Sequence, residues 1–591
     1  MSYHEEEVLG KAYDRRLARR LLKYLYPYRG VVALSVFLLL IASALQLAGP
    51  YLTKVAIDQY IHQGDAGGLD TIALLFLGVL VLQFIFSFLQ TYLMNWTGQK
   101  IMYDLRVEIF SHIQGLHIEY FDRNPVGRII TRMTTDVDVL NELFTAGVVS
   151  IFGDIFLLTG IIGVMMFINW KLALVSFAVI PLLFLASFIF KTKVRGSYRW
   201  VRTCIAKINA FLQENITGMS VVQIFVQEDR KLRQFDGLNR EHLQANLQSI
   251  FYYAVFYPVI NLLGAVAIAL ILWYGGNQVL SGLLTLGALV AFLQYSERFY
   301  KPISDLSEKF NILQSAMASS ERIFKLLDTP PRILPAEYPL APDVVEGKIE
   351  FKNVSFAYKE DNPVLKNINL EIQPGEKVAI VGATGSGKST MINLLCRFYE
   401  LKRGELRIDG IDIKQWDFNL LRQSIAIVLQ DVFLFSGTVE ENIRLWSKPI
   451  PREKVEEAAM RVHAERFIQR MPGGYDAAVA ERGSSLSVGQ RQLLAFARAL
   501  AHDPRILILD EATSSVDTET ELLIQDALDK LMRGRTSLII AHRLSTIQNC
   551  DRIIVLHKGE IKEQGSHADL LKQRGIYYKL YQLQYKEQLV S

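Results

Sequence analysis

Nine consecutive residues in the second half of the chain have the types and spacing needed to hold a phosphate chain. The first eight follow the pattern GxxxxGK[ST], and the nine residues are Gly382, Ala383, Thr384, Gly385, Ser386, Gly387, Lys388, Ser389 and Thr390. In such a loop glycines let backbone N–H groups close around phosphate oxygens, the lysine neutralises the β and γ phosphates, and the serine hydroxyl suits magnesium. An apolar run at 378–381 precedes the loop and a helical pattern follows it. This strand–loop–helix context predicts a site for a nucleoside triphosphate with Mg²⁺.

A second apolar run, at 506–509, ends in two carboxylates, Asp510 and Glu511. We expect them at the sheet edge where a phosphate-bound magnesium would lie. Asp510 can hold the metal through water, and Glu511 can polarise the attacking water, a role worth roughly 10²- to 10⁴-fold in rate. The alternative is a solvated acidic strand end, and the phosphate loop upstream argues against it. The predicted chemistry is hydrolysis of a phosphate anhydride.

The first half of the chain predicts helices that cross a membrane. Half of the 591 residues are hydrophobic, and a bilayer core about 30 Å thick needs roughly 20 apolar residues per helix. The stretch between Glu241 and Glu297 is uncharged and too long for one crossing, and Gly275, Gly276 and Asn277 interrupt it. It therefore predicts two spans around a tight turn at 275–277. Four further spans, which complete an α-helical six-span domain, are predicted at 30–52, 71–96, 144–168 and 172–190.

The distribution of lysine and arginine predicts the orientation of these spans. Basic residues are dense between Arg15 and Arg29 and in the segments 99–140 and 191–250, and the opposite connections carry only Lys54 and Lys171. Because basic residues stay on the cytoplasmic side, we expect both termini and the long loops in the cytoplasm. The cytoplasmic segments keep helical periodicity, which fits extensions that reach a soluble domain or two solvated helical hairpins.

The net charge and the cysteines limit the classes of partner and site that the chain can have. The net charge of +4 is small and the basic residues lie next to apolar spans, which favours membrane lipid as a partner and predicts no nucleic-acid binding. Cys204, Cys396 and Cys550 are too far apart to indicate a disulfide framework or a zinc site.

Five prolines within 330–342 predict a linker, and the Val/Ile runs after it alternate with helical segments, as in an α/β domain. The expected domains are an amphipathic elbow at 1–29, a six-helix transmembrane domain at 30–325, a linker at 326–347, a nucleotide-binding domain at 348–580 and a tail at 581–591.

Residues 486–492, with the sequence LSVGQRQ, carry a family resemblance. They resemble the signature sequence of ABC transporter ATPases, and the fused six-span domain is similar to that of the type IV exporters of this family. The resemblance covers nearly the whole chain and implies a multi-pass protein of the inner (plasma) membrane that uses ATP and Mg²⁺ to drive export. Segments 120–136 and 214–225 resemble the coupling loops of the family. The site residues that it implies are Tyr358 for adenine stacking, Gln430 for a link between magnesium and the membrane domain, His542 for a γ-phosphate contact, residues 514–517 for a crossing between subunits, and Ser487, Gly489 and Gln490 for the signature contact.

The resemblance also implies a second chain, because in this family the signature of one ATPase domain completes the ATP site of the other. Val488 stands where the family usually has glycine, and it adds a branched side chain where backbone should approach the γ-phosphate. Glu511 is intact. This combination resembles the competent half of heterodimeric exporters, which have one hydrolytic and one degenerate ATP site. We therefore favour a heterodimer over a homodimer.

The sequence leaves the transported substrate open. Asp154 lies within a span, where a charge should face the bundle interior or a wet cavity, and it fits either a contact with a cationic substrate or a structural bond to a neighbouring helix. The aromatic residues of the last two spans fit either the lining of an apolar substrate cavity or packing within the core and at the membrane interface. They are Phe251, Tyr252, Tyr253, Phe256, Tyr257, Tyr295, Phe299 and Tyr300. The leading hypothesis is export of drugs, lipids or other small amphipathic molecules. The alternatives are an ATP-gated channel or regulatory subunit on the same fold, and a homodimeric exporter of lipid or peptide.

Overall fold

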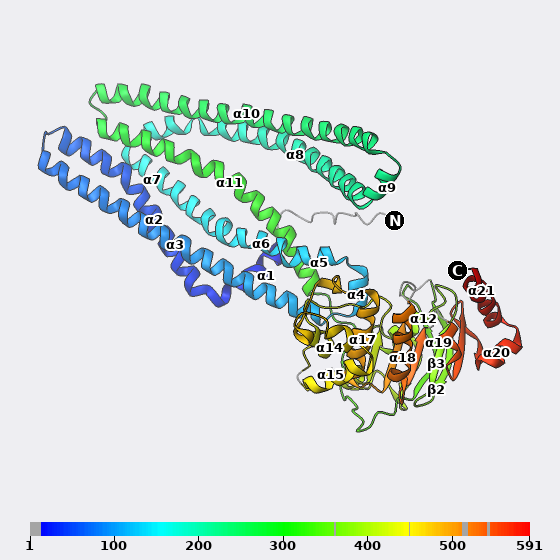
Figure 1. The fold of residues 1–591 in the computed structure, drawn as a ribbon. Helices are drawn as coiled ribbons and strands as arrows, with labels where there is room; N and C mark the ends of the chain where they lie inside the picture. Colours follow the sequence, from blue (N-terminus) through cyan, green and yellow to red (C-terminus); the bar gives the residue numbers. More distant parts are fainter. Residues whose placement is uncertain (1–13, 360–361, 448, 511–517, 541–543, 591) are drawn as a thin grey trace. The chain divides into compact units, whose positions relative to one another are not determined.

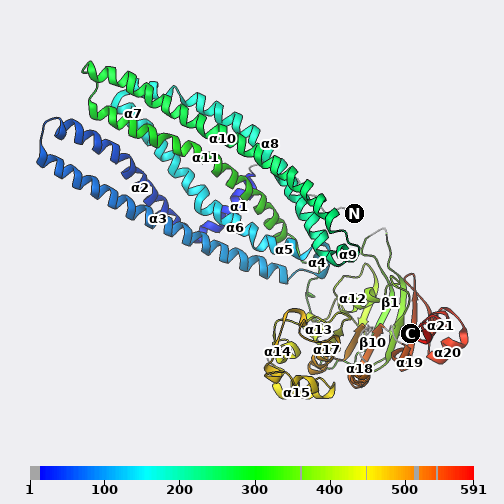
Figure 2. The same ribbon diagram turned by 45° about the horizontal axis from the view of Figure 1, so that its top comes forward.

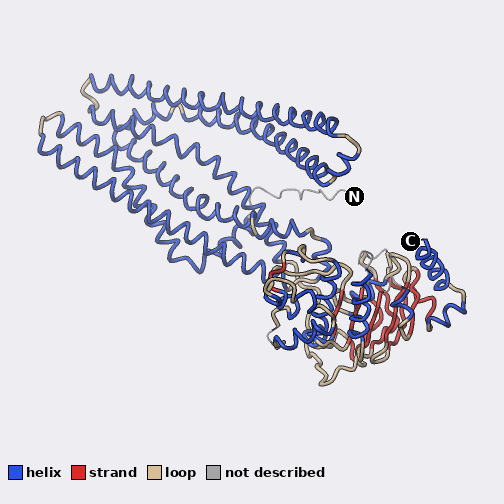
Figure 3. The backbone as a smooth tube through the Cα atoms, in the orientation of Figure 1, coloured by secondary structure: helices blue, strands red, loops and turns tan. Residues whose placement is uncertain are grey.

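The computed structural model describes residues 14–359, 362–447, 449–510, 518–540 and 544–590. The chain forms two compact units. One comprises Met1–Ile113 with Gly127–Thr329, and the other comprises Gln114–Val126 with Pro330–Ser591. The first is helical and the second is an α/β unit. Strands, drawn red in Figure 3, gather in the α/β unit, and the helical unit consists of helices and short connections.

The helical unit is built from long helices that run side by side (Figures 1 and 2). Helices α8 and α10 pair along their length and are joined through the short α9. The described helices are α1 (Arg15–Leu25), α2 (Arg29–Val55), α3 (Ala66–Gln114), α5 (Val126–Met133), α6 (Thr135–Glu142), α7 (Val149–Phe177), α8 (Ile180–Thr217), α9 (Met219–Ile224), α10 (Glu228–Leu280) and α11 (Leu286–Leu327), with short 3-10 or π turns at Tyr26–Tyr28, Ala56–Ile61 and Leu143–Val148.

Several of these helices are long and apolar enough to cross a membrane. Among the described residues, four stretches meet this condition by length and composition, and α8 and α11 are two further helices of 38 and 42 residues. Exposed aromatic side chains cover their surfaces, among them Phe167 at 87% and Trp273 at 70% exposure, as expected of faces that meet lipid. The four stretches are Arg15–Ile61, Ala66–Gln114, Val126–Phe177 and Glu228–Leu280.

The turn predicted at 275–277 is wrong, because α10 continues through these residues to Leu280 and the chain turns at 281–285. Gly275 is buried, and a Cβ there would lie 2.7 Å from Leu289 Cδ1 and 3.3 Å from Leu172 Cδ2. Glycine therefore serves close packing of α10 against α7 and α11. Small residues have this role at helix contacts in membranes, and it outweighs the roughly 1 kcal/mol that glycine costs inside a helix.

Within the described residues, the α/β unit contains three sheets. A six-stranded sheet has the order β12-β11-β3-β10-β9-β6, in which β12 alone is antiparallel to its neighbour; a four-stranded antiparallel sheet has the order β2-β1-β4-β5; and β7 pairs with β8. The strands are β1 (Ile349–Phe356), β2 (Leu365–Ile372), β3 (Lys377–Val381), β4 (Arg403–Ile408), β5 (Ile411–Asp412), β6 (Ile425–Val428), β7 (Gly437–Thr438), β8 (Ala478–Val479), β9 (Ile506–Asp510), β10 (Thr536–Ile540), β11 (Arg552–His557) and β12 (Glu560–Gly565).

Burial along the strands explains this architecture. Every residue of β10 is buried, as in parallel strands covered on both faces, whereas β2 alternates buried and exposed positions. The helices of this unit are α4 (Ile118–Arg123), α12 (Lys388–Leu395), α13 (Phe418–Ser424), α14 (Val439–Arg444), α15 (Arg452–Arg461), α16 (Glu465–Ile468), α17 (Val488–His502), α18 (Thr518–Met532), α19 (Leu544–Gln548), α20 (His567–Gln573) and α21 (Ile576–Val590), with 3-10 turns at Gly474–Asp476 and Glu481–Gly483.

Candidate functional site

The loop between β3 and α12 is held tightly by its surroundings. A Cβ on Gly382 would lie 2.2 Å from the carbonyl oxygen of Leu556 in β11. One on Gly387, whose φ is +108°, would lie 2.6 Å from Leu365 Cδ2. Both positions therefore require glycine. The loop leads directly into the N-terminus of α12, where backbone N–H groups and the helix dipole stabilise an anion.

Lys388 and Ser386 give this loop its chemistry. Lys388 is 8% exposed, and its Nζ donates to the carbonyl oxygens of Gly382 at 2.7 Å and Ala383 at 3.2 Å. Burial lowers the pKa of Lys388, and the charge of Asp510 opposes that shift. Ser386 is 4% exposed, and its hydroxyl has no hydrogen-bond partner among the described residues. A buried cation near a buried hydroxyl that lacks a partner is costly without a ligand, and phosphate oxygens fit both groups.

Tyr358 lies beside this loop with its ring held by two contacts. Its hydroxyl donates to Thr390 Oγ1 at 3.3 Å and accepts from Asn393 Nδ2 at 3.3 Å. The ring meets Phe356 and Tyr399 edge-to-face, with centroids 5.0 Å apart in each pair. A cavity of about 400 Å³ that Tyr358 helps to line opens next to it. The arrangement fixes an aromatic ring on which a nucleobase can stack.

The residues expected at the metal lie at the ends of two neighbouring parallel strands. Asp510 is the last residue of β9, and Gln430 follows the end of β6, whose Val428 is in register with Leu509. Gln430 is exposed and Asp510 is half-buried. Ser389 is exposed at the start of α12. The carboxyl ends of parallel strands share one sheet edge, so Asp510 and Gln430, which both carry side-chain oxygens, lie at the same edge. Oxygen ligands of this kind suit Mg²⁺.

Three of the expected elements lie outside the described residues. These are Glu511, residues 514–517 and His542.

The signature residues form the start of α17. Ser487 Oγ accepts from the Gln490 backbone N at 3.2 Å, and Gln490 Oε1 accepts from the Ser487 backbone N at 3.0 Å. These two bonds make a capping box, which the spacing Ser-x-x-Gln already indicates. Gly489 is buried, whereas Val488 is 44% exposed. The helix N-terminus is therefore open to an external ligand at Ser487 and Val488.

Arg498, which sequence reasoning missed, anchors α17. Its Nε donates to the Asn442 carbonyl oxygen at 2.8 Å and its Nη1 donates to the Phe433 carbonyl oxygen at 3.1 Å. Burial lowers the pKa of Arg498. Asn442 also accepts from the Phe435 backbone N at 2.8 Å. The signature helix is thus bonded through one arginine to α14 and to the loop that follows Gln430.

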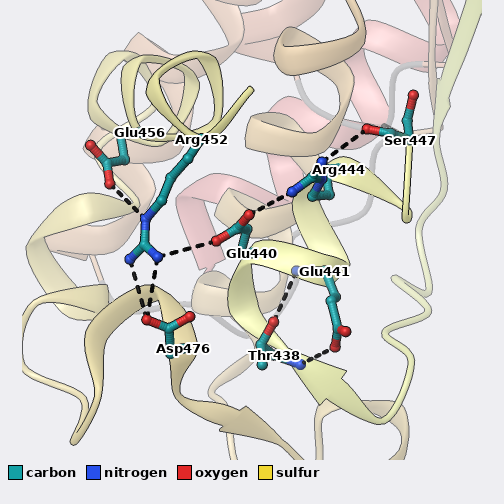
Figure 4. A network of polar contacts seen from close by, with 8 residues as sticks. All are labelled: Thr438, Glu440, Glu441, Arg444, Ser447, Arg452, Glu456 and Asp476. Atoms are coloured by element: carbon teal, nitrogen blue, oxygen red, sulfur yellow. Dashed lines mark hydrogen bonds and ion pairs between the residues drawn. The ribbon is translucent and has the colours of Figure 1, made fainter. Parts of the chain in front are cut away.

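A polar network supports α14 from the other side (Figure 4). Thr438 and Glu441 form a capping box, with bonds of 3.1 Å and 2.8 Å. Glu440 pairs with Arg444 at 2.7 Å and with Arg452 of α15 at 3.5 Å. The Thr-x-x-Glu spacing is a local signature of a helix start.

In the helical unit Asp154 has a structural partner. It forms an ion pair with Lys309, which lies on α11, and both side chains are mostly buried. This favours the interpretation of Asp154 as a bond between neighbouring helices. Among the aromatics considered for a cavity, Tyr295 and Phe299 are core residues, at 0% and 6% exposure, whereas Phe251 is 62% exposed.

Comparison with known proteins identifies both halves of the chain. The family model for the ABC transporter transmembrane region matches residues 32–303, and the ABC transporter model matches residues 365–514. Similar proteins include the uncharacterised ABC transporter ATP-binding protein YknV of Bacillus subtilis, 40% identical over 99% of this chain and 97% of that protein. The ATP-dependent lipid A-core flippase of Syntrophus aciditrophicus is 39% identical over 97% of this chain and 95% of its own length. The probable multidrug resistance ABC transporter ATP-binding/permease protein YheH of B. subtilis is 38% identical over 91% of this chain and 80% of its own length.

These matches span both units, so the fused arrangement is shared with the relatives. The chain therefore belongs to the ABC transporter family, as a multi-pass half-transporter of the type IV exporter kind whose ATPase domain binds ATP with Mg²⁺ and couples its hydrolysis to transport.

Proposed function

We propose that this chain is the hydrolytic half of a heterodimeric pump that exports small amphipathic molecules from the cytoplasm across the inner membrane, with both termini in the cytoplasm. The observation that carries the proposal is the phosphate loop, with its buried Lys388 and its Ser386 hydroxyl, on the same chain as helices with exposed apolar faces. Binding of ATP there can do work on the membrane helices only if ATP binds one arrangement of the transporter more tightly than the other.

We assign the roles of the site as follows. The loop 382–390 holds the phosphates, Lys388 neutralises their charge, and Tyr358 stacks on adenine. Ser389, Asp510 and Gln430 hold Mg²⁺. Glu511 orients the attacking water, and His542 contacts the γ-phosphate.

The exposed start of α17 supports the need for a second chain. Ser487 and Val488 are open at a helix N-terminus, which is a ready anion site, and each chain carries one phosphate loop and one signature. A partner's bound phosphates fit this helix end. Two copies of the chain, or this chain with a different half-transporter, would complete the sites.

Val488 favours a different partner over a second copy. Its side chain is 44% exposed at the helix start, where backbone should approach the partner's phosphate. In the proposed heterodimer this weak signature faces the partner's degenerate site, and the partner supplies a regular signature to the site that contains Glu511.

The names of the relatives support an amphipathic substrate. Among the similar proteins one is named a lipid A-core flippase and another a probable multidrug resistance transporter, and lipids and drugs are the substrate classes in these names. The Asp154–Lys309 ion pair satisfies both charges internally, so the proposal does not rest on a cationic substrate.

The test compares magnesium-dependent ATPase rates of the purified chain alone and purified with a half-transporter encoded beside it. We expect only the pair to hydrolyse ATP, Glu511→Gln to abolish this activity, and Val488→Gly to leave it unchanged. If the lone chain turns over as fast as the pair, and Val488→Gly raises its rate, the transporter is a homodimer and the heterodimer proposal is wrong.

A further inference from the structure

Helix α1 presents two stripes of different chemistry. Arg15, Arg19 and Lys23, spaced by four residues, lie on one stripe with Arg16 next to it, and all four are exposed. None of them forms an ion pair within the described part of the chain. Residues four apart on a helix share a face, so α1 carries a continuous basic surface.

The other stripe of α1 binds the last turns of α11. Arg20 Nη1 forms an ion pair with Asp328 Oδ2 at 2.7 Å, and its guanidinium lies 4.1 Å from the centroid of the Phe324 ring. Tyr24 stacks on the same ring, with centroids 6.3 Å apart and planes inclined by 18°. Phe324 is 2% exposed, and Leu21 of α1 is 3% exposed. The contact is therefore a packed joint built on one buried ring.

The same stripe also binds α3. Tyr24 OH donates to Glu108 Oε2 at 2.9 Å, and in the 3-10 turn that follows α1, Tyr28 OH donates to Asp104 Oδ2 at 2.7 Å. At the end of α3, His112 Nε2 lies 3.0 Å from the carbonyl oxygen of Thr329. Thr329 is the last residue of the helical unit, and the α/β unit resumes at Pro330. Helix α1 thus joins the ends of α3 and α11 next to the point where the chain passes into the ATPase domain.

We propose that the basic stripe of α1 binds anionic lipid headgroups and that the Arg20–Asp328 joint transmits the effect of this binding to the end of α11. The rate of ATP hydrolysis then depends on the charge of the membrane lipids. Charge complementarity selects this partner: four exposed cations face away from the joint, and α1 runs directly into the span that contains α2. Juxtamembrane basic clusters bind acidic membrane surfaces. The inference goes beyond the proposed function and depends on neither the substrate nor the identity of the partner.

The experiment measures the ATPase rate of the complete transporter in nanodiscs of phosphatidylcholine alone and of phosphatidylcholine with phosphatidylglycerol. We expect phosphatidylglycerol to raise the rate about threefold at low salt, and the rise to shrink as ionic strength increases, because exposed charges are screened. Replacing Arg15, Arg16, Arg19 and Lys23 with Gln should remove the rise. The matched control removes four exposed charges of the helical unit that lie further from the predicted spans, at Arg199, Arg202, Arg230 and Arg233, and should keep it.

A second variant separates lipid binding from its transmission. Asp328→Asn leaves the basic stripe intact, so we expect α1 still to bind vesicles that contain phosphatidylglycerol, as measured by lipid quenching of a fluorophore on α1, while the ATPase response is lost. The proposal is overturned if the stripe variant responds to phosphatidylglycerol like the wild type, if the control variant loses the response equally, or if Asp328→Asn keeps the full response. Binding of an acidic protein or of RNA to the stripe without any lipid response would also overturn it.

Discussion

The two units use the same apolar residues in opposite ways. In the α/β unit Phe351, Ile508 and Leu538 are at most 2% exposed, inside one hydrophobic core to which two sheets contribute. In the helical unit Phe84, Phe167 and Phe188 are at least 70% exposed. The difference shows that the positions of apolar side chains depend on what surrounds each unit. Water favours burial of these side chains in the α/β unit, whereas lipid accommodates them on the outside of the helical unit.

The two units also differ in where their polar groups lie and what these groups bind. In the α/β unit they collect in loops at strand ends, where Lys388 and Asp510 lie. In the helical unit polar groups inside the bundle bind one another, as Asp136 does with Arg322 at 2.5 Å and with Ser319 at 2.9 Å. We infer that the first arrangement is available for chemistry and that the second mainly holds helices together.

Phenylalanine-to-alanine substitution in each unit tests the comparison with the largest expected effect. Phe351→Ala removes a ring that is 2% exposed, and we expect a loss of about 3–5 kcal/mol in the stability of the α/β unit. Phe188→Ala removes a ring that is 71% exposed, and its effect should be about 0.5 kcal/mol or less. Calorimetry of the full chain in lipid nanodiscs measures both. Equal losses would contradict the assignment of the Phe188 face to lipid.

Removing the buried lysine of the loop should affect rate instead of stability. Lys388→Ala is expected to lower the ATPase rate about 10²- to 10³-fold, because a preorganised charge facing the phosphates is lost. Lys454→Ala, at an exposed position of α15, is the matched control and should leave the rate unchanged. A Lys388→Ala transporter that hydrolyses ATP at the wild-type rate would show that the loop is not the phosphate site.

Substitutions at the Asp154–Lys309 ion pair test whether it stabilises the helical unit or takes part in transport. Asp154→Asn leaves Lys309 without its partner, and we expect stability to fall by about 2 kcal/mol, somewhat below the cost of a charge at the centre of a span. Replacing Lys309 with Met in the same chain should restore most of the loss, since no charge is then left unpaired. Thermal unfolding of the two single variants and the double variant measures the coupling. A double variant that is stable yet unable to transport would assign the pair to the transport pathway.

The polar network in Figure 4 offers the smallest effects. Thr438→Ala removes a helix cap, which should cost about 1 kcal/mol. Arg452 is 45% exposed, and Arg452→Gln should cost about 0.5 kcal/mol because exposed ion pairs contribute little. Denaturant unfolding of the full chain in detergent separates the two. A larger loss for Arg452→Gln would mean that the network acts as a unit.

The phosphate loop could be predicted because its chemistry is local: it depends on residues a few positions apart. Lys309 and Arg498 could not be, since their partners lie 155 and 56 residues away in the chain. The turn at 281–285 was misplaced for a related reason, because Gly275 meets Leu289 of another helix and a glycine that fits a helix contact looks in the sequence like one that breaks a helix.

The most direct test of the account is transport itself. Inside-out vesicles that contain the complete transporter would be given ATP, Mg²⁺ and a fluorescent amphipathic dye, and the dye inside would be measured against time. We predict accumulation above the outside concentration for the wild type and none for Lys388→Ala. Hydrolysis of ATP with dye that only equilibrates across the membrane would contradict the pump and assign the fold to an ATP-gated channel.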